Sequence, residues 1–249
     1  MAPSCIFQIE DISHLREQTG AIRETVQANG FALIRGIFDR SRIRAFLPTI
    51  LQYISQTEAL PSSGVSAEQI RRNCLKWSIG SQSQSQSGIA RLMMTIMNPT
   101  REPDVLGLRD TFTSLILVRD TLAQREQPLL DDYLPAPKFN GTRLQIYPAG
   151  GGFMTRHIDS RAIDNVRDVS AQYIQLVLLM TEKGTDYTSG GAFVEVAGEF
   201  RDSEANARSG DIVVYDANTM HGVADIDSHK PLDTSGAGAR IVALATVYD

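Results

Sequence analysis

Cysteine is scarce in this sequence, and nothing in it marks a secreted or membrane-bound protein. The only two cysteines, Cys5 and Cys74, form no C-x-x-C motif, which argues against a disulfide framework. The longest uninterrupted apolar run, residues 176–180, is far shorter than the roughly 20 residues that cross a bilayer. The N-terminus lacks the basic region and long apolar run of a signal peptide. We therefore expect a reduced, cytoplasmic protein with no membrane partner.

Positive charge is also in short supply. The sequence has 24 lysine and arginine residues against 29 aspartate and glutamate residues, which gives a net charge of -5 and a pI near 5.4. Nucleic acid and anionic membranes usually bind to basic surfaces. The composition therefore favours a small-molecule partner over nucleic acid. It leaves the oligomeric state open, with a homodimer among the options.

The remaining composition is that of an ordinary globular protein. Hydrophobic residues make up 42% and charged residues 21% of the 249 positions. This length allows a sizeable core, and no convincing internal repeat divides it. We expect one domain over residues 1–249, with a mainly helical part at 1–138 and a β-rich part at 139–249.

The N-terminal part predicts a helix, a strand and a second helix. Residues 11–30 have apolar positions at mostly helical spacing and end in Asn-Gly, a common C-terminal stop. Residues 31–38 are short and apolar, as a buried strand would be, and Ser41 is a suitable cap for a helix that runs to about Tyr53. A further helical pattern lies within residues 104–130 and is broken by the prolines that follow.

A polar, low-complexity run, S-Q-S-Q-S-Q-S, occupies residues 81–87. Such a run cannot bury enough surface to order itself, so it is either a lid over a site or an idle surface loop. Lys76 and Trp77 precede it. Trp77 is a candidate substrate contact, although a lone tryptophan more often belongs to the core.

After Pro137 the pattern changes from helical to stranded. At least six strands are indicated, separated by polar or glycine-rich turns without helical patterns between them. The clearest are T-R-L-Q-I-Y, A-Q-Y-I-Q-L-V-L-L-M-T, G-A-F-V-E-V, D-I-V-V-Y and R-I-V-A-L-A-T-V-Y. Antiparallel strands connected in this way usually close as a sandwich or a jelly roll, so the expected fold class is α+β with a jelly-roll core.

The chemistry of the chain centres on an H-x-D motif, His157 and Asp159, in Y-P-A-G-G-G-F-M-T-R-H-I-D-S. Two residues apart on an extended strand, these side chains point to the same face. His221, in G-D-I-V-V-Y-D-A-N-T-M-H-G-V, is the candidate third ligand, brought across by closure of the sheet. Two histidines and one carboxylate form the facial set that holds Fe(II) with positions open for dioxygen and a substrate.

This combination of motifs, which ends in a strand that opens with Arg240, resembles the iron(II)- and 2-oxoglutarate-dependent oxygenases. The resemblance covers residues 140–249 and implies a double-stranded β-helix, a cupin-like jelly roll with N-terminal flanking helices. It implies that His157, Asp159 and His221 ligate Fe(II), and that 2-oxoglutarate and O2 are cosubstrates.

The resemblance also assigns the cosubstrate site. It implies that Arg240 holds the distal carboxylate of 2-oxoglutarate, a role that suits a charged, bidentate donor, and that Tyr147 contacts the same molecule. The separation between His221 and Arg240 is longer than in many members. Lys230 lies within this longer segment and is a rival anchor, but it stands in a loop before a proline whereas Arg240 opens a strand.

The expected reaction is hydroxylation of an unactivated C–H bond, with release of succinate and CO2. Relatives that halogenate have a small residue in place of the carboxylate, whereas this chain keeps Asp159. Desaturation, ring closure and epimerisation stay open, because they start from the same hydrogen abstraction. Two other readings also remain, a cupin-like metalloenzyme that does not use 2-oxoglutarate and a non-catalytic jelly-roll binding module.

The substrate is indicated only by polar side chains near the motif. Arg143 and Gln145 share a strand face with Tyr147, and Asp216 and Asn218 precede His221, so these four residues are candidate substrate contacts. They fit a small polar metabolite, such as an amino acid or a biosynthetic intermediate.

Overall fold

The computed structural model describes residues 5–61, 68–81, 89–130, 139–159 and 174–248. Residues 82–87 of the Ser-Gln run lie outside this part, so the structure does not bear on its role as a lid. The N-terminal elements are β1 (Ile6–Gln8), α1 (Ile12–Asn29), β2 (Ala32–Arg35), α2 (Arg40–Arg44), α3 (Leu47–Gln56), the 3-10 turn η1 (Gln69–Arg71), β3 (Cys74–Gly80), β4 (Arg91–Met97) and α4 (Arg109–Leu122). They are followed by β5 (Phe139–Tyr147), β6 (Gly152–His157), β7 (Ile174–Leu179), β8 (Gly191–Val196), β9 (Glu199–Asp202), β10 (Ile212–Asp216), β11 (Met220–Ile226) and β12 (Arg240–Tyr248).

The first helices begin and end where side chains satisfy their backbone groups. At the start of α1 the Asp11 side chain accepts a hydrogen bond from the His14 amide, and Gly30 ends the helix in the left-handed conformation, which confirms the predicted helix. The next predicted helix is interrupted and forms α2 and α3. Its cap is Asp39, while the Ser41 hydroxyl donates to the Asp39 carboxylate.

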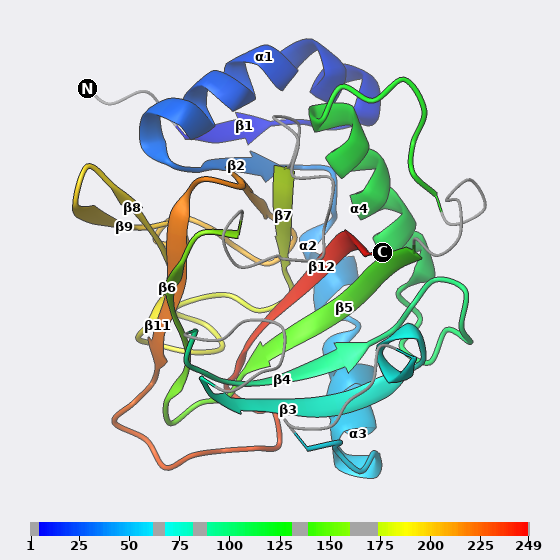
Figure 1. Ribbon diagram of the computed structural model, residues 1–249, viewed down its shortest axis with the longest axis vertical. Helices are drawn as coiled ribbons and strands as arrows, with labels where there is room; N and C mark the ends of the chain where they lie inside the picture. Colours follow the sequence, from blue (N-terminus) through cyan, green and yellow to red (C-terminus); the bar gives the residue numbers. More distant parts are fainter. Residues whose placement is uncertain (1–4, 62–67, 82–88, 131–138, 160–173, 249) are drawn as a thin grey trace.

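Twelve strands form one continuous sheet in the described part of the chain. The strand order is β1-β2-β10-β7-β12-β5-β4-β6-β11-β8-β9, and β3 also pairs with β4. Figure 1 shows the two halves of this sheet facing each other, with β6, β11, β8 and β9 on the left and β3, β4, β5 and β12 on the lower right. This is the double-stranded β-helix that the sequence predicted.

The curled sheet has an inner and an outer face with separate hydrophobic clusters. The inner-face cluster draws on both halves of the sheet and includes Leu33, Met93, Tyr147, Met154, Val177, Val194, Val213, Val223 and Val242. The outer-face cluster includes Ile96, Leu144, Ile146, Leu178, Ile212 and Ile241, together with Ile22 of α1 and Phe112 and Leu115 of α4. Helices α1 and α4 therefore cover the outside of the sheet, and the inside remains for the polar side chains of a site (Figure 1). No helix in the described ranges is both long and apolar enough to cross a membrane.

Three strands of the N-terminal part, β1, β3 and β4, were not predicted from the sequence. In β4 nearly every residue is buried on one face or the other, so R-L-M-M-T-I-M shows no alternation between apolar and polar positions. The predicted helix within 104–130 is shorter than its pattern. Asp104 accepts hydrogen bonds from the Leu108 and Arg109 amides, and the regular helix starts only at Arg109.

The connection into β8 yields a stability prediction. Gly190 has a φ of +81°, and a Cβ added there would lie 2.2 Å from the carbonyl oxygen of Asp225 in β11. Gly184 has a similar φ of +84° but no atom within 4 Å of such a Cβ. We expect Gly184→Ala to lower the free energy of unfolding by about 1–2 kcal/mol, the cost of the left-handed conformation. Gly190→Ala should lower it by roughly 2 kcal/mol more, because β8 and β11 must separate.

Urea denaturation of the two variants measures this difference. Equal losses would show that the β8–β11 contact at Gly190 tolerates a side chain.

Candidate metal centre

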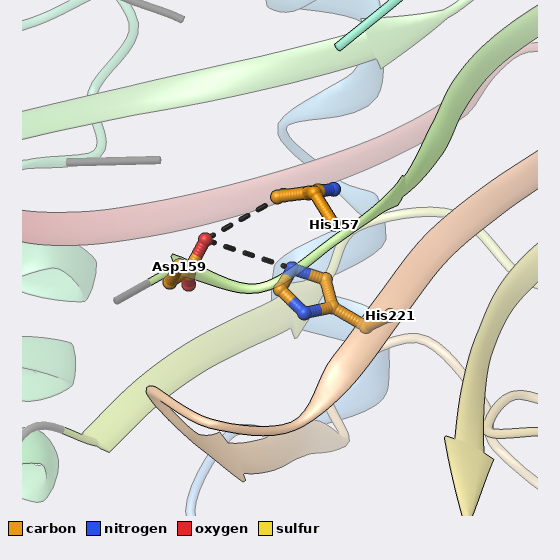
Figure 2. Close-up of side chains that lie close together, drawn as sticks. All are labelled: His157, Asp159 and His221. Atoms are coloured by element: carbon orange, nitrogen blue, oxygen red, sulfur yellow. Dashed lines mark ion pairs between the residues drawn. The ribbon is translucent and has the colours of Figure 1, made fainter. Parts of the chain in front are cut away.

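The three predicted ligands lie together at one end of the barrel interior. His157 is the last residue of β6 and is paired in register with His221 of β11, and Asp159 follows two residues after His157. Figure 2 shows the two imidazoles and the carboxylate pointing at a common point. All three side chains are buried, and their candidate ligand atoms lie within 4.8 Å of one another.

The local structure differs from the prediction in two respects. Strand β6 ends at His157, so Asp159 reaches the site from the segment after the strand, not by alternation along it. His221 is the second residue of β11, a strand that its sequence M-H-G-V-A-D-I did not reveal because it contains a glycine and an aspartate.

Hydrogen bonds to the backbone hold both imidazoles in the form that binds metals. Nδ1 of His157 lies 3.0 Å from the Thr155 carbonyl oxygen, and Nδ1 of His221 lies 2.9 Å from that of Thr219. A carbonyl only accepts, so each Nδ1 carries the proton and each Nε2 presents a lone pair. The two Nε2 atoms lie 3.5 and 3.7 Å from Oδ1 of Asp159. The three donor atoms are thus close enough to bind one metal ion together.

Burial sets the charge of the site. Desolvation lowers the pKa of His221 to about 4, although the Asp159 carboxylate opposes this shift. Burial alone would raise the pKa of Asp159, but its interactions with His157, His221 and Arg143 outweigh burial and lower it. At neutral pH the site therefore presents a neutral His221 and an anionic Asp159. This nitrogen and oxygen donor set fits Fe(II).

Tyr215 completes the wall beside the metal ligands. Its ring centroid lies 4.3 Å from that of His221, and the two histidine rings are 4.2 Å apart. Tyr215 comes from β10 in the opposite half of the sheet, so this contact spans the interior.

Arg240 is the first residue of β12 and lies on the inner face opposite Tyr147, but it already has an acidic partner. Its Nε is 2.9 Å and its Nη2 is 2.5 Å from Oε1 of Glu204, and both side chains are almost fully buried. The Tyr187 hydroxyl and the Ala192 amide donate to the same carboxylate at 2.7 and 3.1 Å. The guanidinium carbon lies 5.1 Å from the centre of the Tyr147 ring.

Glu204 is a site residue that sequence reasoning missed. It stands in the polar stretch D-S-E-A-N-A-R, where an isolated glutamate has no periodic signal. The rival anchor Lys230 instead donates to Asp227 at 2.7 Å in the connection between β11 and β12. Tyr147 is buried against Arg240 and donates to Gln145 at 3.1 Å.

The predicted substrate contacts fall into two groups. Arg143 and Gln145 lie on the inner face, opposite Leu244 and Val242 of the inner-face cluster. The other three do not face the interior. Asp216 accepts hydrogen bonds from the Asn218 amide and the Thr219 hydroxyl, so Asp216 and Asn218 shape the turn before β11. Trp77 packs against the outer-face cluster.

Neither a family model nor a curated protein matches the sequence. Solved structures do match the fold. A prolyl-4-hydroxylase from Pseudomonas putida superposes with a TM-score of 0.56 over 93% of this chain and 100% of that chain, at 14% identity. The non-heme, alpha ketoglutarate-dependent epimerase SnoN of nogalamycin biosynthesis gives 0.56 over 96% and 83%, at 12% identity. EctD from S. alaskensis gives 0.54 over 100% and 78%, at 13% identity.

The fold is that of the 2-oxoglutarate-dependent oxygenases. In this oxygenase fold the N-terminal strands β1–β4 belong to the same sheet as the motif-bearing strands. The oxygenase fold also explains why β6 and β11, distant in sequence, present their histidines side by side.

Proposed function

We propose that the protein is an Fe(II)- and 2-oxoglutarate-dependent oxygenase that hydroxylates an unactivated C–H bond of a small polar metabolite, with release of succinate and CO2. The observation that supports it best is the pair of imidazoles whose Nε2 atoms both face Asp159 while their Nδ1 atoms bind backbone carbonyls. The similar structures add to this support, since SnoN has been crystallised with Fe3+ and alpha ketoglutarate and EctD with 2-oxoglutarate and 5-hydroxyectoine.

In this proposal His157, Asp159 and His221 hold the iron and leave its other positions to the cosubstrates. Bound iron, together with 2-oxoglutarate and O2, supplies the oxidising power, while the protein supplies orientation and the exclusion of water. The inner-face cluster around Met154, Val223 and Tyr215 provides that dry environment. Retention of Asp159 favours hydroxylation over halogenation, because the carboxylate takes the position that a halide would need.

Arg240 would hold the distal carboxylate of 2-oxoglutarate by the edge that Glu204 leaves open. Glu204 accepts from Nε and Nη2, and Nη1 makes no hydrogen bond within the described residues. A guanidinium can bind two carboxylates along different edges because it has five N–H donors. Glu204 would thereby fix the orientation of Arg240 above Tyr147 before the cosubstrate arrives.

An anaerobic titration tests the proposal. We expect the purified protein to bind one Fe(II) and then 2-oxoglutarate, and to form succinate when O2 and a suitable small metabolite are added. A screen of free amino acids is the natural first panel. Iron binding without 2-oxoglutarate binding or succinate would indicate a cupin-like metalloenzyme of another kind. Absence of iron binding would leave a jelly-roll binding module.

A further inference from the structure

We propose that the barrel interior contains a second carboxylate-binding site, formed by Arg91 and Lys76 and separate from Arg240, which takes an acidic group of the substrate. The proposal rests on the proposed function and narrows its substrate class to small organic acids.

Arg91 is a buried cation without a counter-ion in the described part of the chain. It is the first residue of β4 and only 7% exposed, and it shares the inner strand face with Met93. Its Nη2 is fully buried and has no hydrogen-bond partner there, while its Nε reaches only the Ile89 carbonyl at 3.4 Å. An unpaired buried charge is among the costliest arrangements in a folded protein, so such a group indicates a partner that binds from outside.

Lys76 brings a second positive charge to the same face. In the register of β3, β4 and β5 it lies opposite Thr95, which lies opposite Gln145, so all three side chains are on the inner face. Its ammonium group makes no hydrogen bond or ion pair within the described ranges. Burial lowers the pKa of Lys76, and the charges of Arg143 and Arg91 lower it further. An anion bound between Lys76 and Arg91 would offset both the cost of burying the ammonium group and its repulsion by the neighbouring positive charges.

The charge balance at Arg240 differs from that at Arg91 and Lys76, which distinguishes the two sites. Glu204 neutralises Arg240, whereas Arg91 has no acidic partner among the residues that the structure describes. The described part of the chain thus has a balanced ion pair at Arg240 and two cations without a counter-ion at Arg91 and Lys76. A carboxylate matches the planar donor edge of a guanidinium.

The site lies close enough to the metal ligands for one small molecule to reach both. Arg91 is paired in register with Met154 of β6, and the Thr155 amide donates to the Ala90 carbonyl at 2.9 Å. Met154 is three residues before His157, which is about 10 Å along a strand. An acid held by Arg91 would therefore present a carbon several bonds from its carboxylate to the metal.

Arg91→Gln tests the proposal, with Arg91→Lys as the charge-retaining variant and the exposed Arg72→Gln as a matched control. The probes are carboxylic acids and their amides, such as glutamate against glutamine. In the wild type and in Arg72→Gln we expect the acids, not the amides, to raise the temperature of unfolding and to stimulate succinate formation. In Arg91→Gln the acid concentration that gives half the maximal effect should rise at least tenfold. In Arg91→Lys this concentration should lie between those of the wild type and Arg91→Gln.

The results separate this proposal from its alternatives. If Arg91→Gln weakens anaerobic 2-oxoglutarate binding, the site belongs to the cosubstrate and the assignment to substrate is wrong. If Arg91→Gln responds to acids as the wild type does, Arg91 has only a structural role. The same holds if acids have no effect on the wild type while Arg91→Gln unfolds at a markedly lower temperature. If the wild type forms no succinate at all, the proposed function fails, but the acid-dependent shift in unfolding temperature still tests the site.

Discussion

Asp159→Ala is expected to abolish both Fe(II) binding and iron-dependent conversion of 2-oxoglutarate to succinate, with a fall in rate of at least about 100-fold. The carboxylate is the only anionic donor of the triad and lies within 3.7 Å of both Nε2 atoms, so its loss leaves two neutral ligands. Anaerobic iron titration and succinate detection measure the two effects.

The structure also predicts that this variant folds. Without iron, burial opposes the charge of Asp159, but His157, His221 and Arg143 lower its pKa, so the charge contributes some stability to the metal-free protein. Thermal unfolding of the metal-free variant should remain cooperative and occur moderately below the wild-type temperature. Asp225→Ala, which removes an exposed aspartate from β11, is the matched control and should keep full iron binding. Full turnover in Asp159→Ala would refute the metal assignment.

The sequence predicted two kinds of feature well. One is a site that only a few residue types can form, and the other is a helix or strand with a regular spacing of apolar residues. Few residue types can ligate iron, so His157, Asp159 and His221 were identified before their distances were known. Helix α1 has an apolar stripe and a glycine stop, and β12 is a long run of strand-forming residues. These signals are local, and local signals can be read from one sequence.

The parts that the sequence did not predict depend on contacts between distant segments. Glu204 acquires its role only because Arg240 and Tyr187 lie beside it in the folded chain. Arg91 was not singled out, because a lone arginine in a methionine-rich strand gives no sign of being buried without a partner. The opposite orientations of Lys76 and Trp77 follow from a strand, β3, whose existence was not expected.

Separating Arg240 from Glu204 should have the largest effect on stability. Arg240→Gln leaves a fully buried carboxylate without its cation, and Glu204→Gln leaves a buried guanidinium without its anion. Each single variant is expected to lose about 3–5 kcal/mol of unfolding free energy. The double variant removes both charges and should recover most of this loss, because neutral amides can keep hydrogen bonds to Tyr187 and Ala192. Urea denaturation of the four proteins gives the coupling energy, and additive losses would contradict the pairing.

The pH dependence of the same four proteins gives an independent test. Burial would raise the pKa of Glu204, but the Arg240 charge and the hydrogen bonds to the carboxylate outweigh burial and lower it below its usual value of 4.5. A carboxylate whose pKa is lower in the folded state stabilises fully above its unfolded pKa, and this stability is lost as the pH falls through the folded value. The wild type should therefore lose stability below a pH of about 4.5 more steeply than the double variant.

Binding of 2-oxoglutarate by the double variant then distinguishes a cosubstrate-binding role of Arg240 from a purely structural one. If Nη1 of Arg240 holds the distal carboxylate, the folded double variant should bind 2-oxoglutarate at least tenfold more weakly, a cost of about 1.4 kcal/mol, while it still binds Fe(II). Unchanged affinity would show that the Arg240–Glu204 pair is structural and would move the anchor to another cation of the inner face. Arg91 is then the next candidate, because it is the buried guanidinium there whose Nη2 has no partner among the described residues.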